Sequence, residues 1–236
     1  MTQVSVVVPV YNEVESLPLL HDSIVDALAA ASLTFEIVMV DDGSKDGSSD
    51  LLDGIARRDP RVRVLHFDGN FGQTAAFDAG FKSARGDVVV TIDADLQNDP
   101  ADIPMIVAAC LPSTVVCGIR VRREDSLVRR VSSRVANAVR RAATGDPVVD
   151  TGCSLKAFHR SDLLKIKLFT GMHRFLPVLL ELEGCAIVQL PVKHHPRRFG
   201  RSKYGIGNRL FRGIKDLFAV RWMQQRHLGY RIRSES

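Results

Sequence analysis

Two aspartates end an apolar run near the middle of the sequence. In VVVTIDADLQNDP, residues 88 to 100, five β-branched residues lead into Asp93 and Asp95, and Gln97 follows. Carboxylate oxygens suit Mg²⁺ or Mn²⁺, above all beside substrate phosphates, and the Gln97 amide offers a further neutral oxygen. The same pattern suits a loop in which Asp95 caps a helix. Taken alone, the motif therefore leaves a metal site and a helix cap both open.

Two further polar clusters follow apolar runs earlier in the chain. YNE comes directly after residues 4 to 10, and DDGSKDGS comes after residues 35 to 40. Gly43 and Gly47 allow tight turns, and Asp and Ser side chains can hydrogen-bond to a base and a ribose. An Asx turn that leads into a helix cap would give the same pattern. Neither a dinucleotide fingerprint nor a P-loop motif occurs in the sequence.

Strand-like and helix-like patterns alternate over the first half of the chain, and this predicts an α/β fold. Such alternation is typical of parallel crossovers, in which helices cover both faces of a mostly parallel sheet. Ligands of these sheets bind at the carboxyl ends of the strands, where the three polar clusters lie, so we expect one shared site. The expected strands span residues 4–10, 35–40, 61–67, 87–92 and 113–119, and the expected helices span residues 16–31, 48–58, 72–84 and 101–111.

The pattern changes in the second half of the chain. Residues 126–143 are expected to form a basic amphipathic helix. The segments GCSLKAF and AIVQLPV are expected strands. A loop rich in Pro, Gly and Arg, residues 193–205, precedes a second basic helical stretch over residues 206–228. The solvated face of the first basic helix is expected to carry Arg129, Arg140 and Arg141.

Length and composition indicate a globular protein of about one large domain. The chain has 236 residues, of which 45% are apolar and 25% are charged. Its four cysteines lack metal-ligand spacing, so we expect buried thiols in a reducing compartment. No apolar run approaches the roughly 18 to 20 residues that span a bilayer, and no signal peptide is evident.

The net charge of +5 conceals an asymmetry along the chain. From Lys193 onward there are twelve Lys and Arg residues against two acids, whereas the preceding residues carry a surplus of five acids. A basic tail on an acidic body suggests a polyanionic partner, such as a nucleic acid, an anionic membrane or a phosphorylated substrate. Because the tail has few aromatic residues for base stacking and the acidic body would repel a duplex, a nucleic-acid partner is not expected.

Four segments, in their order and spacing, resemble glycosyltransferase family 2. They are VVVPVYNEVESLP, VMVDDGSKDGS, NFGQTAAFDAGFKSARGD and TIDADLQNDP. Within that family the chain resembles the polyprenyl-phosphate glycosyltransferases, which include dolichyl-phosphate mannose synthases and bacterial undecaprenyl-phosphate sugar transferases. DTGCSLKAFHR, HRFLP and HHPRRFGRSKYG extend the resemblance over roughly residues 3 to 220. HRFLP and SKYG point to the bacterial members.

The resemblance implies a GT-A fold, a donor sugar linked to uridine or guanosine diphosphate, a divalent metal (Mg²⁺ or Mn²⁺) and a polyprenyl monophosphate acceptor. The implied metal and diphosphate ligands are Asp93, Asp95 and Gln97. The implied nucleotide-binding residues are Pro9, Tyr11, Glu13, Asp41, Asp42, Ser44 and Asp93. The residues implied to bind the acceptor phosphate or the diphosphate are Arg120, Arg134, Arg198 and Lys203. Arginine suits this work because its planar guanidinium meets two phosphate oxygens at once.

The implied reaction is an inverting displacement. An oxygen of the acceptor phosphate attacks the anomeric carbon, and the nucleoside diphosphate leaves. Because a phosphate is already anionic near neutral pH, no general base is assigned. Asp95, Arg120 and Arg134 are the expected catalytic residues, since they would align the acceptor and neutralise the charge that develops.

Two other functions are also compatible with the sequence. A family 2 enzyme that uses a sugar hydroxyl as its acceptor would need a base, and Asp150, Glu181 and Glu183 are candidates. A non-catalytic protein that binds a nucleotide sugar or an anionic membrane is the second alternative. The presence of Asp93, Asp95 and Gln97 argues against it.

We expect a catalytic domain over residues 1–205, with a nucleotide-sugar-binding half (1–119) and an acceptor half (120–205). Residues 206–236 are expected to be a basic amphipathic extension without a transmembrane helix, whereas relatives often continue into such helices. The extension either lies in an anionic headgroup layer or packs on protein. The first alternative makes the protein cytoplasmic and peripheral on the cytoplasmic face of the membrane. A homo-oligomer is also open.

Overall fold

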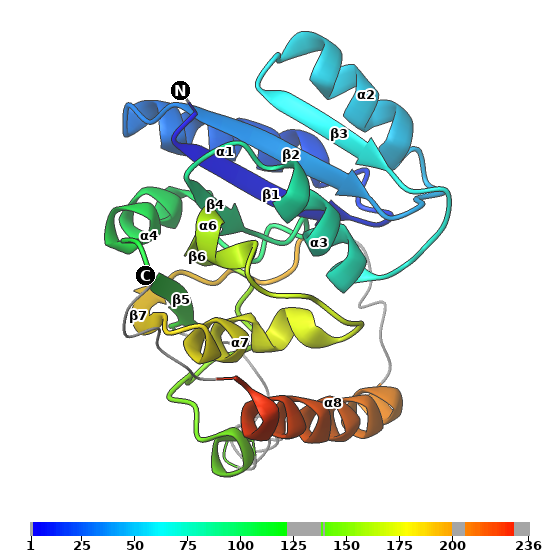
Figure 1. Ribbon diagram of the computed structural model, residues 1–236. Helices are drawn as coiled ribbons and strands as arrows, with labels where there is room; N and C mark the ends of the chain where they lie inside the picture. The colour runs from blue at the N-terminus through cyan, green and yellow to red at the C-terminus, as the bar shows by residue number, and fades with distance from the viewer. Residues whose placement is uncertain (1, 122–137, 139, 200–205, 229–236) are drawn as a thin grey trace, which may run out of the picture.

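A seven-stranded sheet forms the centre of the computed structural model, which describes residues 2–121, 138, 140–199 and 206–228 (Figure 1). The strands lie in the order β3-β2-β1-β4-β6-β5-β7. Strand β6 is antiparallel to both neighbours, and the other pairings are parallel, which confirms a mostly parallel sheet. The strands are β1 (Val4–Val10), β2 (Phe35–Asp41), β3 (Val62–His66), β4 (Val88–Thr91), β5 (Thr114–Arg120), β6 (Lys156–His159) and β7 (Ala186–Val192).

Helices cover both faces of this sheet, and strand β1 shows why. Val6 and Val8 belong to one apolar cluster, whereas Val7 between them belongs to another. Because successive side chains of a strand point to opposite faces, a strand buried on both sides must be apolar throughout. Helices α1 (Leu17–Ala30), α2 (Ser48–Arg58) and α4 (Ile103–Ala109) contribute to the first cluster, and α3 (Gln73–Ser83) and α7 (Leu176–Leu182) contribute to the second.

The expected elements of the first half are all present, with small shifts at their ends. The helix expected over 101–111 begins as a 3-10 turn, η1 (Pro100–Asp102), before α4. The strand expected in GCSLKAF is confined to β6, because residues 151 and 152 form a turn. Two short elements, α6 (Arg160–Leu163) and η2 (Met172–Phe175), follow β6. The four cysteines are buried free thiols, as expected.

The second basic helical stretch forms α8 (Ile206–Arg226), which packs on η2 and α7 (Figure 1). Val220 of α8 is fully buried in a third apolar cluster with Met172 and Phe175, and Leu217 lies against that cluster. Such packing explains why an otherwise polar helix is stable at this length. One face of α8 therefore packs on protein, whereas the alternative of a headgroup layer stays open for the other face.

The solvated position expected for Arg140 is wrong. Arg140 is only 7% exposed, and its guanidinium donates hydrogen bonds to the Asp146 carboxylate and to the carbonyl of Val148. The physical reason is that the chain folds back after the helix and brings Asp146 over the arginine as its counterion. Arg141 is exposed, as expected, whereas Arg129 lies outside the described residues.

The two expected halves share one sheet. Strand β6, from the second half, lies between β4 and β5 of the first half, and β7 pairs with β5 along its whole length. The boundary between residues 119 and 120 falls inside β5, so it does not separate two sets of strands. The division into a donor half and an acceptor half therefore stays a functional prediction.

Candidate active site

The loops that follow β1 and β2 are tied together at the carboxyl edge of the sheet. The amide of Asn12 donates to Ser44 Oγ at 2.9 Å, and the Asn12 side chain accepts from the amide of Lys45 at 2.7 Å. The amide of Glu13 donates to Ser48 Oγ at 3.0 Å. Two of the three polar clusters therefore form one wall, as the sequence predicted.

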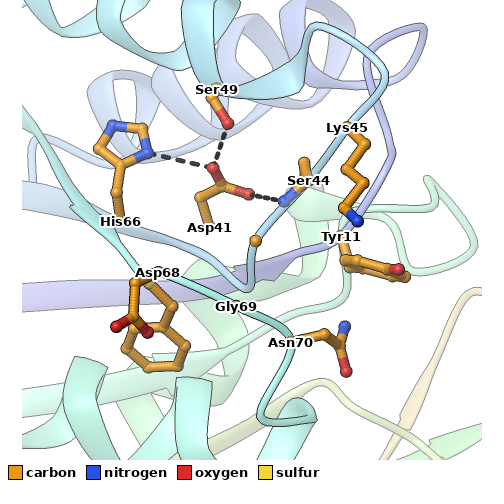
Figure 2. A pocket seen from close by; sticks show the side chains of 11 residues that line it. Tyr11, Asp41, Ser44, Lys45, Ser49, His66, Asp68, Gly69 and Asn70 are labelled. Atoms are coloured by element: carbon orange, nitrogen blue, oxygen red, sulfur yellow. Dashed lines mark hydrogen bonds and ion pairs between the residues drawn. The ribbon is translucent and has the colours of Figure 1, made fainter.

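A pocket of about 510 Å³ opens beside this wall (Figure 2). Its lining comes from the ends of β2 and β3, from the loops that follow β1, β2 and β3, and from the first turn of α2. Three of the expected nucleotide-binding residues, Tyr11, Asp41 and Ser44, line it. The other lining residues are Gly43, Lys45, Ser49, His66, Phe67, Asp68, Gly69 and Asn70. A pocket that offers both an aromatic ring and a buried carboxylate can hold a planar base with polar edges.

Asp41 ends β2 and is the most heavily hydrogen-bonded carboxylate of the pocket. It accepts from the amide of Ser44 at 3.0 Å, from the hydroxyl of Ser49, and from His66 Nδ1 at 3.1 Å. Burial acts to raise the pKa of Asp41, but the hydrogen bonds from Ser44, Ser49 and His66 outweigh it and hold that pKa below its usual value. Asp41 is therefore a charged acceptor in a fixed orientation.

Asp42 has a different place from its neighbour. Its carboxylate accepts from the amides of Phe71 at 2.6 Å and Gly72 at 2.9 Å, which precede α3. Burial raises the pKa of Asp42, and the charge of Asp41 adds to this, although the backbone hydrogen bonds oppose it. Asp42 does not line the pocket. It holds the 70–72 loop in place, and its expected nucleotide contact stays a prediction.

Gly43 shows why this turn contains a glycine. Its φ is +71°, in the left-handed region, and a Cβ built there would lie 2.6 Å from the carbonyl carbon of Gly69. The loops after β2 and β3 therefore approach so closely that a side chain at position 43 would separate them. This contact closes one side of the pocket.

Asp93 and Asp95 follow β4 on the same edge of the sheet. Gln73, at the start of α3, donates from Nε2 to Asp93 Oδ1 at 2.7 Å, and the Asp93 amide donates to Ser154 Oγ at 3.1 Å. Burial raises the pKa of Asp93, and the negative charge of Asp95 raises it further. The two carboxylates therefore repel each other, and a cation between them would relieve that repulsion.

Arg197 supplies a positive charge to Asp95. Its Nη2 lies 2.5 Å from Asp95 Oδ2, and its Nη1 lies 3.6 Å from Glu13 Oε1. Arg197 follows β7 and is 102 residues from Asp95 in the sequence. Sequence reasoning missed this residue and chose its neighbour Arg198, which is exposed. The only signal was the pair of arginines in HHPRRFGRSKYG, and the sequence does not tell which of the two turns inward.

The helix-cap interpretation of Asp95 is wrong, because another residue performs that task. Asp99 accepts from the amide of Ala101 at 3.0 Å and so caps η1. Asp95 Oδ1 accepts only weakly from the amide of Gln97, at 3.2 Å. The metal role expected for Gln97 stays a prediction.

The donor set at this edge suits a hard divalent cation. Asp93 and Asp95 offer carboxylate oxygens. The positive charge of the Arg197 guanidinium already lies against Asp95, where a metal cation would also be attracted. Within residues 2–121, 138, 140–199 and 206–228 no group of three or more His, Cys, Asp or Glu side chains could hold a metal ion. A metal bound at Asp93 and Asp95 would complete its shell with other oxygen donors, such as phosphate oxygens, water or the predicted Gln97 amide.

Arg120 ends β5 and is held by Asp150. Its Nε and Nη2 donate to the two Asp150 oxygens at 2.7 and 2.8 Å, a bidentate contact. Both side chains are largely buried, at 15% and 9% exposure. Arg120 and the buried Lys156 lie close enough to Asp93 to lower its pKa, against the burial that raises it. Positive charge therefore surrounds the aspartate pair.

Some of the remaining expected residues lie away from the pocket, and others are not among the described residues. Pro9 lies at the end of β1 outside the pocket lining. Arg134 and Lys203 lie outside the described residues. Of the bases weighed for a hydroxyl acceptor, Asp150 is engaged by Arg120, and Glu183 lies 3.4 Å from His227. Burial raises the pKa of Glu181, with a smaller contribution from Asp146.

Comparison with known protein families identifies the family to which this chain belongs. Residues 5–167 match the model of "Glycosyl transferase family 2", a span that includes all three polar clusters. The chain belongs to glycosyltransferase family 2. Within the family it is similar to an undecaprenyl-phosphate 4-deoxy-4-formamido-L-arabinose transferase from Yersinia pestis, with 38% identity over 86% of this chain. The chain spans 63% of the length of that relative.

Solved structures of other proteins share the fold of this family 2 chain. Glucosyl-3-phosphoglycerate synthase from Mycobacterium tuberculosis, in complex with Mn²⁺, UDP and phosphoglyceric acid, aligns with a TM-score of 0.68 and 20% identity, over 97% of this chain and 80% of its own. A mannosyltransferase from Pyrobaculum calidifontis, in complex with GDP-Man and Mn²⁺, aligns with a TM-score of 0.66 and 20% identity, over 97% of this chain and 65% of its own. The GT-A fold expected from the sequence is confirmed.

Proposed function

We propose that this chain is the catalytic part of an inverting glycosyltransferase that moves a sugar from a nucleotide sugar to a polyprenyl monophosphate. One observation carries the proposal. A pocket lined by Tyr11 and Asp41 and large enough for a nucleoside lies on the same sheet edge as the Asp93–Asp95 pair, and arginines approach that edge from the acceptor half. The similarity to an undecaprenyl-phosphate sugar transferase supports the choice of acceptor.

The donor would lie along the carboxyl edge of the sheet. Asp41 would accept a hydrogen bond from an N–H of the base, and Tyr11 would lie against the base or the ribose. The diphosphate would then reach Asp93 and Asp95. Arg197, which now neutralises Asp95 and lies near Glu13, is the loop arginine best placed to meet the diphosphate oxygens. Pro9, Glu13, Asp42 and Ser44 would support this side from the β1 and β2 loops.

Mg²⁺ or Mn²⁺ at Asp93 and Asp95, with Gln97 nearby, would supply charge neutralisation to the leaving diphosphate. The chain's own contribution is to orient the two reactants. Gln73 and Ser154 fix the position of Asp93, so the carboxylate pair meets the donor without rearrangement. The acceptor needs no general base, because its phosphate oxygen is already anionic.

The acceptor phosphate would be bound by arginines of the second half. Arg120 is held rigid by Asp150 and is therefore a preorganised cation beside the aspartate pair. Arg134, Arg198 and Lys203 are the further residues proposed for acceptor phosphate or diphosphate. Rigid alignment of a phosphate oxygen with the anomeric carbon would supply a substantial part of the rate enhancement.

We further propose that the chain works at an anionic membrane surface, on the cytoplasmic face, through α8. Phe218 and Trp222 are 72% and 62% exposed, although Val220 between them is buried. Lys215, Arg221 and Arg226 are also exposed along the outer surface of the helix. No described helix is both long and apolar enough to cross a bilayer. Aromatic side chains among basic ones are typical of helices that lie in a headgroup layer.

The activity is tested by direct synthesis of the product. Purified protein is incubated with a short polyprenyl phosphate, Mg²⁺ or Mn²⁺, and each of a panel of UDP- and GDP-linked sugars, and lipid products are examined by mass spectrometry. We expect one glycosyl phosphate lipid, and none when the matching polyprenol without phosphate replaces the acceptor. A product on a sugar hydroxyl, or no product with any donor, would contradict the proposed reaction.

A further inference from the structure

His66 bridges two carboxylates at the edge of the pocket. Its Nδ1 lies 3.1 Å from Asp41 Oδ2, and its Nε2 lies 3.1 Å from Asp53 Oδ1. His66 ends β3, Asp41 ends β2 and Asp53 belongs to α2, so one imidazole joins three elements around the pocket. Figure 2 shows the ring beside Asp41, with Ser49 of α2 on the same carboxylate. Asp41 and His66 are also partners in the β2–β3 register.

Only a charged ring can donate a hydrogen bond to both carboxylates at once. A neutral imidazole has one N–H and can donate to only one carboxylate, whereas the imidazolium donates from both nitrogens. Burial acts to lower the pKa of His66, but the hydrogen bonds and charges of Asp41 and Asp53 outweigh it and raise that pKa above its usual value. Asp41 is almost fully buried, and Asp53 is half exposed.

Two other charged side chains line the pocket without contacting the ring. Lys45 comes from the loop after β2 and lies near Tyr11 in Figure 2. Asp68 comes from the loop after β3. Among the described charged groups, Asp41 and Asp53 are therefore the two whose interaction with His66 depends directly on its proton.

We propose that protonated His66 is a positioning residue that fixes Asp41 for the base of the donor, so that donor binding weakens as His66 loses its proton. The proposal rests on the proposed function, because it takes Asp41 as a nucleotide contact. In the charged state Asp41 has three donors and one orientation, so an N–H of the base meets a preorganised acceptor. In the neutral state His66 must release Asp41 or Asp53, and its bare nitrogen then faces a carboxylate oxygen.

The experiment follows donor affinity against pH. The probes are UDP-glucose and GDP-mannose with Mg²⁺, measured by titration calorimetry from pH 6 to pH 8.5. Both diphosphates are doubly esterified and do not titrate in this range, and the base N–H that Asp41 would accept from stays largely protonated. For whichever probe binds, we expect a plateau at low pH and then a fall in affinity of roughly tenfold, the size of one net hydrogen bond.

Two variants separate this role from a merely structural one. Asp53→Asn removes the outer carboxylate, so it should keep the low-pH plateau and move the fall to lower pH. His66→Gln can donate one hydrogen bond but carries no titrating proton. It should bind with the weak affinity that the unchanged protein shows at high pH, and that affinity should not vary with pH. Circular dichroism and melting temperature establish that both variants are folded.

Several outcomes would overturn the proposal. Donor affinity that is flat with pH in the unchanged protein would remove it while leaving the proposed function intact. Equal affinity of His66→Gln and the unchanged protein at pH 6, or the same pH profile in both, would also exclude His66 as the positioning group. A folded protein that binds neither nucleotide sugar at any pH would contradict the proposed function and this proposal with it.

Discussion

At the scale of single residues, aspartates that lie close together in the sequence have different structural roles in this protein. Asp41 faces the pocket and is held in its charged form, whereas Asp42 turns away and accepts the amides before α3. Asp95 likewise contacts Arg197, whereas Asp99, four residues later, caps η1. Chemical type alone does not assign these roles. They follow from which donors the surrounding loops bring within reach.

Replacement of Asp95 by alanine tests the donor side of the site. We expect Asp95→Ala to lower turnover by about 100-fold or more, which is typical when one electrostatic element of a transition state is removed. The melting temperature should change little, because the loss of the carboxylate also releases Arg197 to solvent. The measurement is product formation under saturating donor with Mn²⁺.

Asp26→Ala is the matched control, because Asp26 lies on an exposed position of α1. This variant should retain full turnover. Unchanged turnover of Asp95→Ala in Mn²⁺ would show that Asp95 does not serve the reaction. A large drop in melting temperature would mean that the carboxylate has a structural role.

At the scale of elements, α8 has two faces with different partners. Val220 and Leu217 pack on η2 and α7, which fixes the helix on the body of the protein. Phe218 and Trp222, one helical turn apart, remain exposed. Because the apolar side chains of the inner face are already packed, Phe218 and Trp222 contribute little to the stability of the fold. Their exposed rings can therefore contact a membrane or another protein.

Liposome flotation tests that outer face. With vesicles of mixed neutral and anionic lipid, we expect the protein to float, and Phe218→Ser combined with Trp222→Ser to remain at the bottom with an unchanged melting temperature. Leu111→Ser, which alters another exposed apolar side chain (63% exposed), is the matched control and should float. Val220→Ala should instead cost roughly 2 kcal/mol of unfolding free energy.

Flotation that is equal with purely neutral vesicles would remove the electrostatic part of the membrane proposal. A protein that stays at the bottom with every lipid, and whose oligomer dissociates when Phe218 and Trp222 are replaced, would assign the outer face of α8 to a second copy of the chain. Sedimentation velocity measures that second outcome.

At the scale of the whole molecule, the order of strands prevents the first and second halves of the chain from forming separate domains. The fourth and fifth strands of the first half are not neighbours, because β6 from the second half lies between them. Both faces of the sheet are also shared, since α7 packs in the same apolar cluster as α3 on one face, and Leu155 and Val192 join the cluster of α1 on the other. The residues proposed for donor and acceptor are therefore positioned by one continuous sheet, with Asp93 after β4 and Arg120 at the end of β5.

This arrangement predicts the behaviour of a fragment. A chain of residues 1–119 would expose the edges of β4 and β5 and lose the apolar cover of α7. Unpaired strand edges promote aggregation, so we expect the fragment to be insoluble or unfolded by circular dichroism, whereas the full chain unfolds cooperatively. A soluble fragment with native-like amide dispersion in its NMR spectrum would contradict this prediction and support two separable halves.

The sequence by itself determined the elements and the edge where the polar clusters meet. Strand and helix periods are short-range patterns, and parallel strands with buried faces leave polar residues only at their ends. The family motifs lie in the same segments, so the fold and the Asp93–Asp95 pair could be predicted together. The insertion of β6 could not be predicted, because pairing between distant strands depends on the whole sheet.

Only the tertiary structure decided which side chains meet across that edge. Gln73 reaches Asp93, Arg197 reaches Asp95, and Asp53 reaches His66, each from a different element. A one-residue shift in the β3 register would turn His66 to the other face of the sheet, and a one-residue shift along α2 or α3 would rotate Asp53 or Gln73 by about 100° around the helix axis. Contacts of this kind are set by the register of neighbouring strands and by the packing of the loops. No spacing within a single segment encodes them.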